Sequence, residues 1–220
     1  RFKPINDVHG HETGDRILSV GGFMTGAETR HTFRAPWFAD CTGDGTVGIL
    51  AGAPFRMGIE ARSEFGESMC AEEPQDPVMG CSMQMHAHDA GRPVPFTKPE
   101  WVDLTLDAED FGPDRDICGG FMARKGGFWW LEWGGELDTV HDTVRIREQI
   151  HEIIYAAWDY LKNRSPIKDE IQTYELDWVG AIPGKRESRR LEGDHLLSQV
   201  DIETQRHFDD AVAYGGWGFD

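Results

Sequence analysis

The chain lacks long apolar runs and has few of the basic residues that mark membrane or nucleic-acid-binding proteins. No apolar stretch in its 220 residues approaches the ~20 residues of a membrane-spanning helix. Lys and Arg number 22 against 39 Asp and Glu, so the net charge is −17. Such an acidic surface repels phosphate backbones, and no basic tract offsets it. The composition therefore predicts no membrane span and argues against nucleic acid as a partner.

Cysteine is also scarce. The four cysteines, Cys41, Cys70, Cys81 and Cys118, lie far apart and form no C-x-x-C pair. This spacing predicts reduced thiols or small buried side chains and no metal site, because zinc and iron–sulfur centres need clustered ligands. The first residues show no signal-peptide core, and we expect a cytoplasmic protein. They also lack an initial Met, which indicates a piece of a longer chain.

A glycine-rich run narrows the function more than any other part of the sequence. Residues 37–53 read WFADCTGDGTVGILAGA, in which Gly43, Gly45 and Gly48 form a G-x-G-x-x-G pattern. We expect a short strand at Pro36–Ala39, a tight turn and a helix of small residues, in which the backbone can approach a phosphate. The pattern alone is weak, since 26 residues are glycine. The segment after it reads as charged helix and loop, which does not complete a dinucleotide-binding βαβ unit.

The remaining sequence predicts further strands and helices. We expect hairpin-like strands over Gly21–Ala39 with the bend at Thr25-Gly26, a strand at Met79–His88, an aromatic hairpin-like stretch at Gly119–Gly135, a helix at Asp142–Asn163 and a strand at Leu176–Ile182. The helix has the clearest signal, because its apolar residues recur every three or four positions. Asp142 is its expected N-cap, and Lys162 and Arg164 suit its C-terminal dipole. The predicted fold class is α/β or α+β.

Three separated motifs carry a family resemblance. They are Phe38–Gly45 with Leu50–Ala53, the run Gly127–Gly135 with the helix after it, and Lys185–Asp194. In this order they resemble bacterial FAD-dependent oxidoreductases, distant relatives of the fumarate reductase and succinate dehydrogenase flavoproteins, over residues 16–220. The resemblance implies part of a glutathione-reductase-like FAD domain without its first Rossmann fingerprint, and a mixed-sheet substrate-binding domain. The implied segments are FAD-domain strands at 19–72, the substrate-binding domain at 73–178 and a return to the FAD domain at 179–220.

The resemblance implies FAD as the cofactor. In the glycine turn the implied contacts are Asp40, Thr42, Gly43, Asp44 and Gly45. The alternative is that Asp40 and Thr42 only close the turn. In the C-terminal motif the implied contacts are Arg186, Glu187, Gly193 and Asp194. Clustered guanidinium groups there suit a pyrophosphate or a reduced flavin, and the alternative is a solvated face whose arginines pair with neighbouring acids.

An aromatic cluster and a carboxylate are candidates for substrate binding and catalysis. Trp129, Trp130 and Trp133 could stack on a sugar ring or a flavin edge, and core packing is the alternative. Residues 129, 131 and 133 would share one face of a regular strand, and residues 128, 130 and 132 the other. Glu132 is the candidate base on that second face.

Two histidines are further catalytic candidates. His86 and His88 lie two positions apart, so on a strand they point the same way and could move protons. Asp89 is the one acid beside them, and no third metal ligand is evident. We therefore predict no metal there, and polar loop residues are the alternative.

The first 18 residues resemble a different family. They match the start of the GGDEF diguanylate cyclase domain, in which the residues matching Asn6 and Asp15 contact guanine. The upstream metal-binding Asp and the Gly-Gly-Asp-Glu-Phe motif are absent, so this segment alone cannot perform cyclase chemistry. A coincidental polar turn, a fusion, or an assembly join near residues 14–18 would explain the match. A join predicts that the segment fits poorly with the fold behind it. The matching residues are Phe2, Lys3, Ile5, Asn6, Asp7, Gly10, His11, Gly14, Asp15 and Leu18.

The sequence thus predicts a flavin enzyme acting on a small organic substrate, by resemblance a carbohydrate-related one. Because the first dinucleotide fingerprint is missing, we expect this chain by itself to bind FAD weakly or not at all and to show no turnover. One alternative is a catalytically inactive carbohydrate- or partner-binding module that uses the face of Trp129–Trp133. Another is a nucleotide-signalling enzyme acting through residues 1–18. The oligomeric state is left open.

Overall fold

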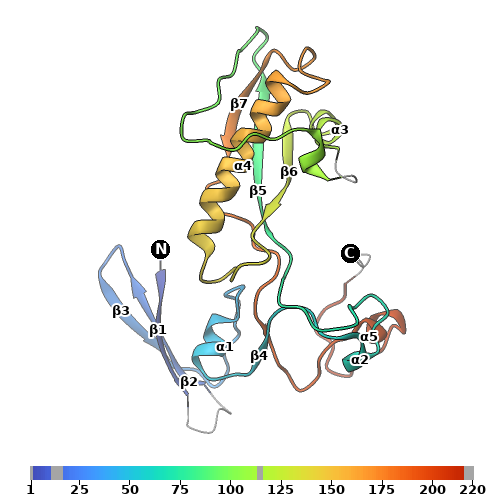
Figure 1. Ribbon diagram of the computed structural model, residues 1–220. Helices are drawn as coiled ribbons and strands as arrows, with labels where there is room; N and C mark the ends of the chain where they lie inside the picture. The colour runs from blue at the N-terminus through green and yellow to red at the C-terminus, as the bar shows by residue number, and fades with distance from the viewer. Residues whose placement is uncertain (1, 11–16, 113–115, 216–220) are drawn as a thin grey trace. The chain divides into compact units, whose positions relative to one another are not determined.

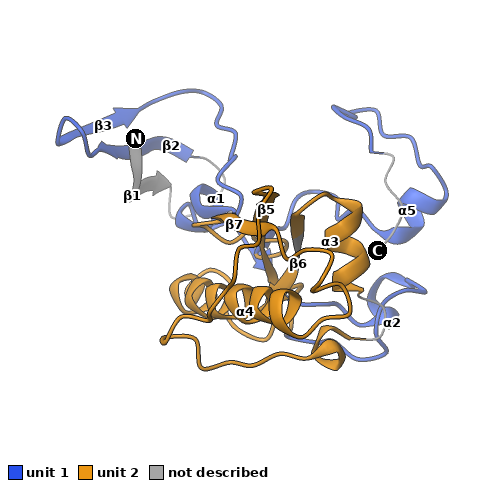
Figure 2. Cartoon of the chain, turned by 90° about the horizontal axis from the view of Figure 1, so that it is seen from above, with its two compact units in different colours: residues 1–76, 189–220 blue, residues 77–188 orange. Residues whose placement is uncertain are grey.

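The computed structural model describes residues 2–10, 17–112 and 116–215 and divides into two compact units. Unit 1 comprises residues 1–76 and 189–220, and unit 2 comprises residues 77–188 (Figure 2). The sequence-based domain boundaries at 72/73 and 178/179 remain predictions about domains. The compact units change at 76/77 and 188/189.

Unit 2 is built on a three-stranded sheet in the order β6-β5-β7 (Figure 1). Its strands are β5 (Cys81–Asp89), β6 (Gly127–Trp133) and β7 (Tyr174–Val179). Both neighbours run antiparallel to the central strand β5, so the expected mixed sheet is wrong for the described residues. The apolar pattern of a strand reveals that it is paired but carries no information on the direction of its neighbour. The strand expected at Leu176–Ile182 begins two residues earlier and ends three earlier.

The helix α4 (Thr143–Asn163) covers one face of this sheet (Figure 2) and confirms the predicted helix. Alternate residues of β5 face it and are buried, while the residues between them face the opposite, open side. Asp142 occupies the N-cap position, but its carboxylate accepts from the Asp138 N–H instead of capping the helix. The core of unit 2 includes Met83, Met85, Ile146, Ile150, Ile154 and Trp158.

The C-terminal end of α4 is fixed by a buried lysine. Nζ of Lys162 donates to the carbonyl oxygens of Ile171, Gln172 and Tyr174 at 3.1, 2.9 and 2.8 Å. Burial lowers the pKa of this ammonium group. The sequence suggested only a favourable interaction with the helix dipole. The structure instead shows a bridge from α4 to the start of β7.

The predicted aromatic hairpin is wrong in its first half. Residues Ile117–Ala123 form the helix α3, and only Gly127–Trp133 is a strand. The Asp116 side chain caps α3 by accepting from the Gly119 N–H at 3.0 Å. Ile117 and Phe121 lie four residues apart and are both buried, which is the spacing of one helix face. The two glycines of α3 concealed this signal in the sequence.

A β-bulge breaks the predicted alternation in β6. Met83 pairs with Leu131 and Met85 with Phe128, so two residues of β6 oppose one residue of β5. Phe128 and Leu131 are consequently both buried, whereas regular alternation would place them on opposite faces. The bulge falls on Trp129 and Trp130, whose side chains lie outside the described part of the structure.

Unit 1 begins with a three-stranded antiparallel sheet of β1 (Phe2–Gly10), β2 (Ile17–Met24) and β3 (Thr29–Phe33). The turn between β2 and β3 contains Thr25-Gly26 and confirms the predicted hairpin. Residues 2–10 of the cyclase-like segment thus pair with the strand that follows, which opposes the expected poor fit. Residues 11–16, including Asp15, lie outside the described residues.

The rest of unit 1 consists of short elements. They are α1 (Thr46–Leu50), β4 (Phe55–Arg56), α2 (Arg62–Phe65), β8 (Arg190–Leu191) and α5 (Gln199–Glu203), while unit 2 also contains the 3₁₀ helix η1 (Ala108–Phe111). The helix expected after the glycine turn is confirmed as α1. The strand expected at Pro36–Ala39 is wrong, because no strand in the described residues pairs with it and Trp37 is 88% exposed.

Candidate functional site

The glycine turn closes on the Asp40 carboxylate. Oδ1 accepts hydrogen bonds from the Thr42 backbone N–H at 3.0 Å and hydroxyl at 2.7 Å, and Oδ2 accepts from the Gly48 N–H at 2.9 Å. The Thr42 hydroxyl oxygen accepts from the Thr46 N–H at 2.7 Å. Partial burial alone would raise the pKa of Asp40, but the hydrogen bonds from Gly48 and Thr42 hold that pKa below its usual value. The Asp40 and Thr42 side chains therefore shape the turn.

The tip of the turn presents backbone N–H groups. Gly43 and Gly45 have φ angles of 83° and 63°, in the left-handed region that glycine adopts readily. Neither N–H has a hydrogen-bond partner among the described residues, and a Cβ atom at Gly43 would meet nothing within 4 Å. Backbone N–H groups that a turn leaves unpaired are donors of the kind that bind anions. Contact of Gly43 and Gly45 with a phosphate group of the cofactor stays a prediction.

The part of the C-terminal motif from Arg189 onward packs against this turn within unit 1. Nε of Arg189 donates to the Asp44 carbonyl oxygen at 2.9 Å, across 145 positions of sequence. Leu191 lies so close to α1 that a Cβ atom at Gly48 would be 2.6 Å from its Cδ1. Leu191 also pairs with Phe55 where β8 meets β4. The structure thus brings together two of the three motifs that carry the family resemblance.

Arg186 and Glu187, two of the expected cofactor contacts, belong to unit 2. Nη1 of Arg186 donates to Oε1 of Glu132 at 3.0 Å. Oε2 of Glu187 accepts from the Met79 N–H at 3.1 Å, and its carbonyl oxygen accepts from the Thr139 hydroxyl at 3.0 Å. Both side chains are therefore engaged with residues of unit 2.

Two arginines of unit 1 pair with acids, although not in the pairs of motif arginines with Glu187, Glu192 and Asp194 that the alternative interpretation expected. Nη1 and Nη2 of Arg190 donate to the Gly58 carbonyl oxygen at 2.9 Å and to Oε1 of Glu60 at 2.6 Å. Arg56 donates to Glu192 at 2.8 Å. Beyond this cluster, Gly193 and Asp194 are exposed. Arg189, which the sequence did not favour, is the arginine that contacts the glycine turn.

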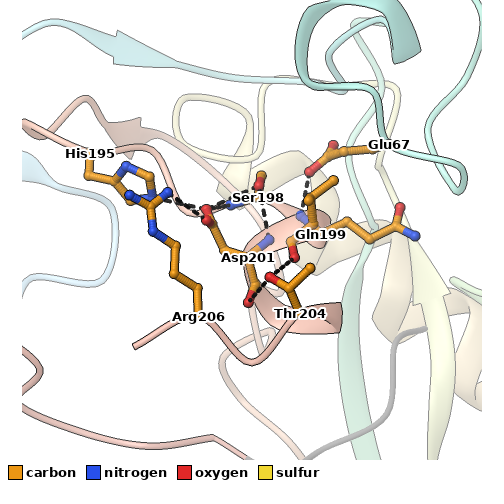
Figure 3. A network of polar contacts seen from close by, with 8 residues as sticks. Glu67, His195, Ser198, Gln199, Asp201, Thr204 and Arg206 are labelled. Carbon is orange, nitrogen blue, oxygen red and sulfur yellow. Dashed lines mark hydrogen bonds and ion pairs between the residues drawn. The ribbon is translucent and has the colours of Figure 1, made fainter. Parts of the chain in front are cut away.

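A polar network continues the motif into α5 (Figure 3). Oδ2 of Asp201 accepts from the Ser198 N–H at 3.1 Å and lies 2.9 Å from Nε2 of His195, while Oδ1 accepts from Arg206 at 3.0 Å. The hydrogen bonds from Ser198, with those from His195 and Arg206, place the pKa of Asp201 far below its usual value. The Gln199 N–H donates to Glu67 at 2.6 Å, which ties α5 to the loop after α2.

The predicted histidine pair lies on the open face of the unit 2 sheet. His86 and His88 are exposed on the same side of β5, which confirms the spacing argument. Their Nδ1 atoms lie 3.5 and 3.6 Å from the two carboxylate oxygens of Asp177 on β7. Trp178 pairs with His86 across the strands, is 51% exposed and borders a hollow of about 390 Å³. Asp177 and Trp178 were not predicted as site residues, because their only signal in the sequence was an acid beside an aromatic residue in a predicted strand.

Glu132 is not part of this histidine cluster. It pairs with Ser82, whereas His86 pairs with Gly127. The two positions lie four residues apart on β5, which corresponds to about 13 Å along the strand. Trp133 is partly buried against the core, in line with the core-packing alternative. The predicted catalytic residues therefore fall into two separate places.

No group of three or more His, Cys, Asp or Glu residues within the described ranges could hold a metal ion. The four cysteines are free thiols. No helix in the described part of the chain has the length and hydropathy to cross a bilayer.

A glycine turn open to a phosphate, with an arginine from a distant segment beside it, is typical of dinucleotide-binding proteins. The chain matches the model of the FAD dependent oxidoreductase family over residues 5–220 and belongs to that family. It is an oxidoreductase-family flavoprotein with FAD as the cofactor. The match takes in more of the chain than the expected 16–220. Comparisons with curated proteins and with solved structures found no match.

The residues of unit 1 fit part of this cofactor. The N–H groups of Gly43 and Gly45 and the guanidinium group of Arg189 are hydrogen-bond donors, which is the chemistry that a pyrophosphate needs. These three residues would hold the phosphate groups. Asp40 would act indirectly, because its carboxylate is used within the turn.

Proposed function

We propose that this chain functions in an FAD-dependent oxidoreductase that acts on a small organic substrate. The observation that carries the proposal is the packing of Arg189 and Leu191 on the glycine turn, because it assembles the two separated cofactor motifs in one unit. The four free thiols suit a reducing, cytoplasmic location. We further propose that the protein is a distant relative of the fumarate reductase and succinate dehydrogenase flavoproteins. We also propose that its substrate is carbohydrate-related.

The proposed chemistry divides the tasks between the cofactor and the protein. Bound FAD would supply the acceptor or donor of electrons, and the protein would supply binding, orientation and proton transfer. His86 and His88 would exchange the substrate proton, with Asp177 orienting their rings from the neighbouring strand. Trp178 offers a flat apolar surface for the substrate body. Glu132 as a base, and Trp129, Trp130 and Trp133 as substrate contacts, remain proposals.

FAD titration of the purified chain tests the cofactor site. We expect weak binding, with a dissociation constant of about 0.1–1 mM in flavin fluorescence anisotropy, because one fingerprint is missing. Arg189→Ala should weaken binding about tenfold, since it removes the cation beside the phosphate turn. Arg92→Ala, at an exposed loop position, is the charge-matched control and should bind like the unaltered chain. Equal affinities of the two variants would contradict the site.

The exposed Trp178 supports a second candidate function, a carbohydrate- or partner-binding module without catalysis. An indole ring among polar side chains on an open sheet face suits stacking on a sugar ring. The discriminating measurement is sugar binding by calorimetry. Binding that survives Arg189→Ala and Arg186→Ala but is lost in Trp178→Ala would favour the module over the flavin enzyme.

A further inference from the structure

The strand β7 lies at one edge of the unit 2 sheet (Figure 1), and part of its backbone is unpaired. At its two ends, the Thr173 carbonyl oxygen and the Gly180 N–H bond to β5 and to the residue that follows β5. Backbone groups alternate between the two sides of a strand, and one bulge falls at Asp177, so those of Leu176 and Val179 point away from β5. Within the described residues, no segment other than β5 bonds to the backbone of Leu176 or Val179. This edge therefore presents donors and acceptors of the kind that bind a further strand.

The unpaired part of β7 is short. At the start of the strand, Nζ of Lys162 donates to the Tyr174 carbonyl oxygen at 2.8 Å, so this position already has a partner. Further along, the bulge at Asp177 bends the strand, and a bulge limits how many residues a neighbouring strand can pair with. The β7 edge, which we define as the outer side of Glu175–Val179, therefore suits a short extended segment.

A hollow of about 290 Å³ borders this edge. Every residue of β7 lines it, together with the extended segment Val94–Phe96 and with Tyr155 and Trp158 of α4. Trp158 is buried, and Phe96 is partly buried against the core. A strand that paired with the β7 edge would direct every second side chain to the face of the sheet that α4 covers. Because aromatic rings stand at the hollow there, an apolar side chain is complementary to it.

The opposite side of the β7 edge is acidic. Glu175 pairs with His88 and Trp178 with His86 across the strands, so both side chains lie on the open face of the sheet. The carboxylate of Asp177 is near both histidines, at 3.5 and 3.6 Å. Glu175, in contrast, makes no hydrogen bond or ion pair within the described residues. Side chains directly opposite one another in paired strands interact, so a basic residue beside Glu175 would be attracted, in a chain whose net charge is −17.

We propose that the β7 edge binds a short extended segment of a partner protein by strand addition, with a basic side chain at Glu175 and apolar side chains toward the hollow. The partner segment alternates basic and apolar residues, because successive side chains of a strand point to opposite faces. A second copy of this chain is a poor occupant, since its own β7 edge would bring like charges together. The surface goes beyond the proposed flavin chemistry, because it is the side of β7 that faces away from β5 and its histidines.

The test uses three synthetic peptides with blocked ends. The first, acetyl-Gly-Lys-Val-Lys-Phe-Lys-Gly-amide, alternates basic and apolar residues, the second has Glu in place of each Lys, and the third has the order Gly-Lys-Lys-Lys-Val-Phe-Gly. Calorimetry with the full chain should give the first peptide a dissociation constant of about 1 mM or below, and at least about tenfold weaker binding of the other two. Equal affinities of the three peptides, or binding of none of them by the folded chain, overturn the proposal.

Amide hydrogen exchange shows where the first peptide binds. The N–H groups of Leu176 and Val179 should exchange more slowly in the complex, because they become part of a ladder of hydrogen bonds. Binding of the peptide without this protection overturns the proposal. Protection of the same two groups by dimerisation of the chain in the absence of peptide, as followed by analytical ultracentrifugation, would assign the edge to a second copy and overturns it as well.

Charge reversal on the protein tests the acidic side of the edge. Glu175→Lys should weaken binding of the Lys peptide at least about tenfold and strengthen binding of the Glu peptide, because a direct charge pair reverses its preference. Glu73→Lys makes the same change of net charge at an exposed position of unit 1 and should alter both affinities by less than about twofold. Equal effects of the two substitutions overturn the proposal. If circular dichroism shows that Glu175→Lys does not fold, Glu175→Gln and Glu73→Gln make the same comparison with the Lys peptide, and equal affinities again overturn it.

Discussion

At the scale of single residues, the cysteines differ in reactivity because their surroundings differ. Sγ of Cys70 donates to Oε2 of Glu67 at 2.9 Å, and this hydrogen bond, with burial, raises the pKa of Cys70 to about 11. Cys41 is exposed. Because the thiolate is the reactive form, Cys41 should be alkylated by iodoacetamide at about pH 8 well before Cys70. Peptide mapping by mass spectrometry after short exposures measures the alkylation of both thiols. The Glu67→Gln substitution should accelerate the alkylation of Cys70. Equal labelling of the two thiols would contradict the hydrogen bond.

The second residue-scale prediction concerns Asp201, which makes the folding stability depend on pH. Its folded-state pKa lies below that of the unfolded chain because Ser198, His195 and Arg206 surround the carboxylate. Its stabilisation is therefore complete above the unfolded pKa of about 3.9 and is lost as the pH falls through the folded pKa. Asp201→Asn should lower the denaturation midpoint clearly at neutral pH and less at about pH 3. The exposed Asp210→Asn is the control, and a deficit independent of pH would contradict this linkage.

The sequence predicted the shared face of His86 and His88 but not their partner. Two residues on one strand share a face by local geometry alone, so the spacing was sufficient. Asp177 comes from β7, and only the register of two strands far apart in sequence brings its carboxylate to both imidazoles. Arg189 was missed for the same reason. Composition marks a cluster of arginines, but tertiary packing decides which one reaches the glycine turn.

At the scale of elements, the connection between α4 and β7 should depend on one lysine. Lys162→Met keeps most of the aliphatic side chain but leaves the carbonyl groups of Ile171, Gln172 and Tyr174 without their donor. We expect a loss of about 2–4 kcal/mol in the free energy of unfolding. The exposed Lys168→Met should cost less than about 0.5 kcal/mol. Urea denaturation followed by tryptophan fluorescence measures both, and equal midpoints would show that the bridge does not stabilise the fold.

The elements that the sequence predicted best are those with an uninterrupted period. The helix α4 and the strand β5 repeat their apolar residues over many positions, so their limits came within two residues. The helix α3 was missed because Gly119 and Gly120 weaken the helical signal, although its N-cap, Asp116, is a local feature of the sequence. The bulge in β6 leaves no mark in the sequence, because two buried positions replace one without any change of composition.

At the scale of the whole molecule, net charge should control the response of stability to salt. The chain carries 39 acidic and 22 basic residues, so the compact state repels itself at neutral pH. Surface ion pairs such as Arg62 with Glu72 lose strength in salt, but exposed pairs contribute only about 0–1 kcal/mol each. Screening of the excess of acids should therefore dominate. We expect the melting temperature to rise between about 10 mM and about 200 mM NaCl at neutral pH.

The same measurement near the isoelectric point is the control for this prediction. The sequence gives an isoelectric point near 4.8, where the excess of negative charge has vanished. Salt should then have little effect or lower the melting temperature slightly, because only attractive pairs remain to be screened. Scanning calorimetry at both pH values and both salt concentrations separates the repulsion among the excess acids from the attraction within ion pairs. A melting temperature that falls with salt at neutral pH would mean that local ion pairs outweigh the repulsion of a chain with a net charge of −17.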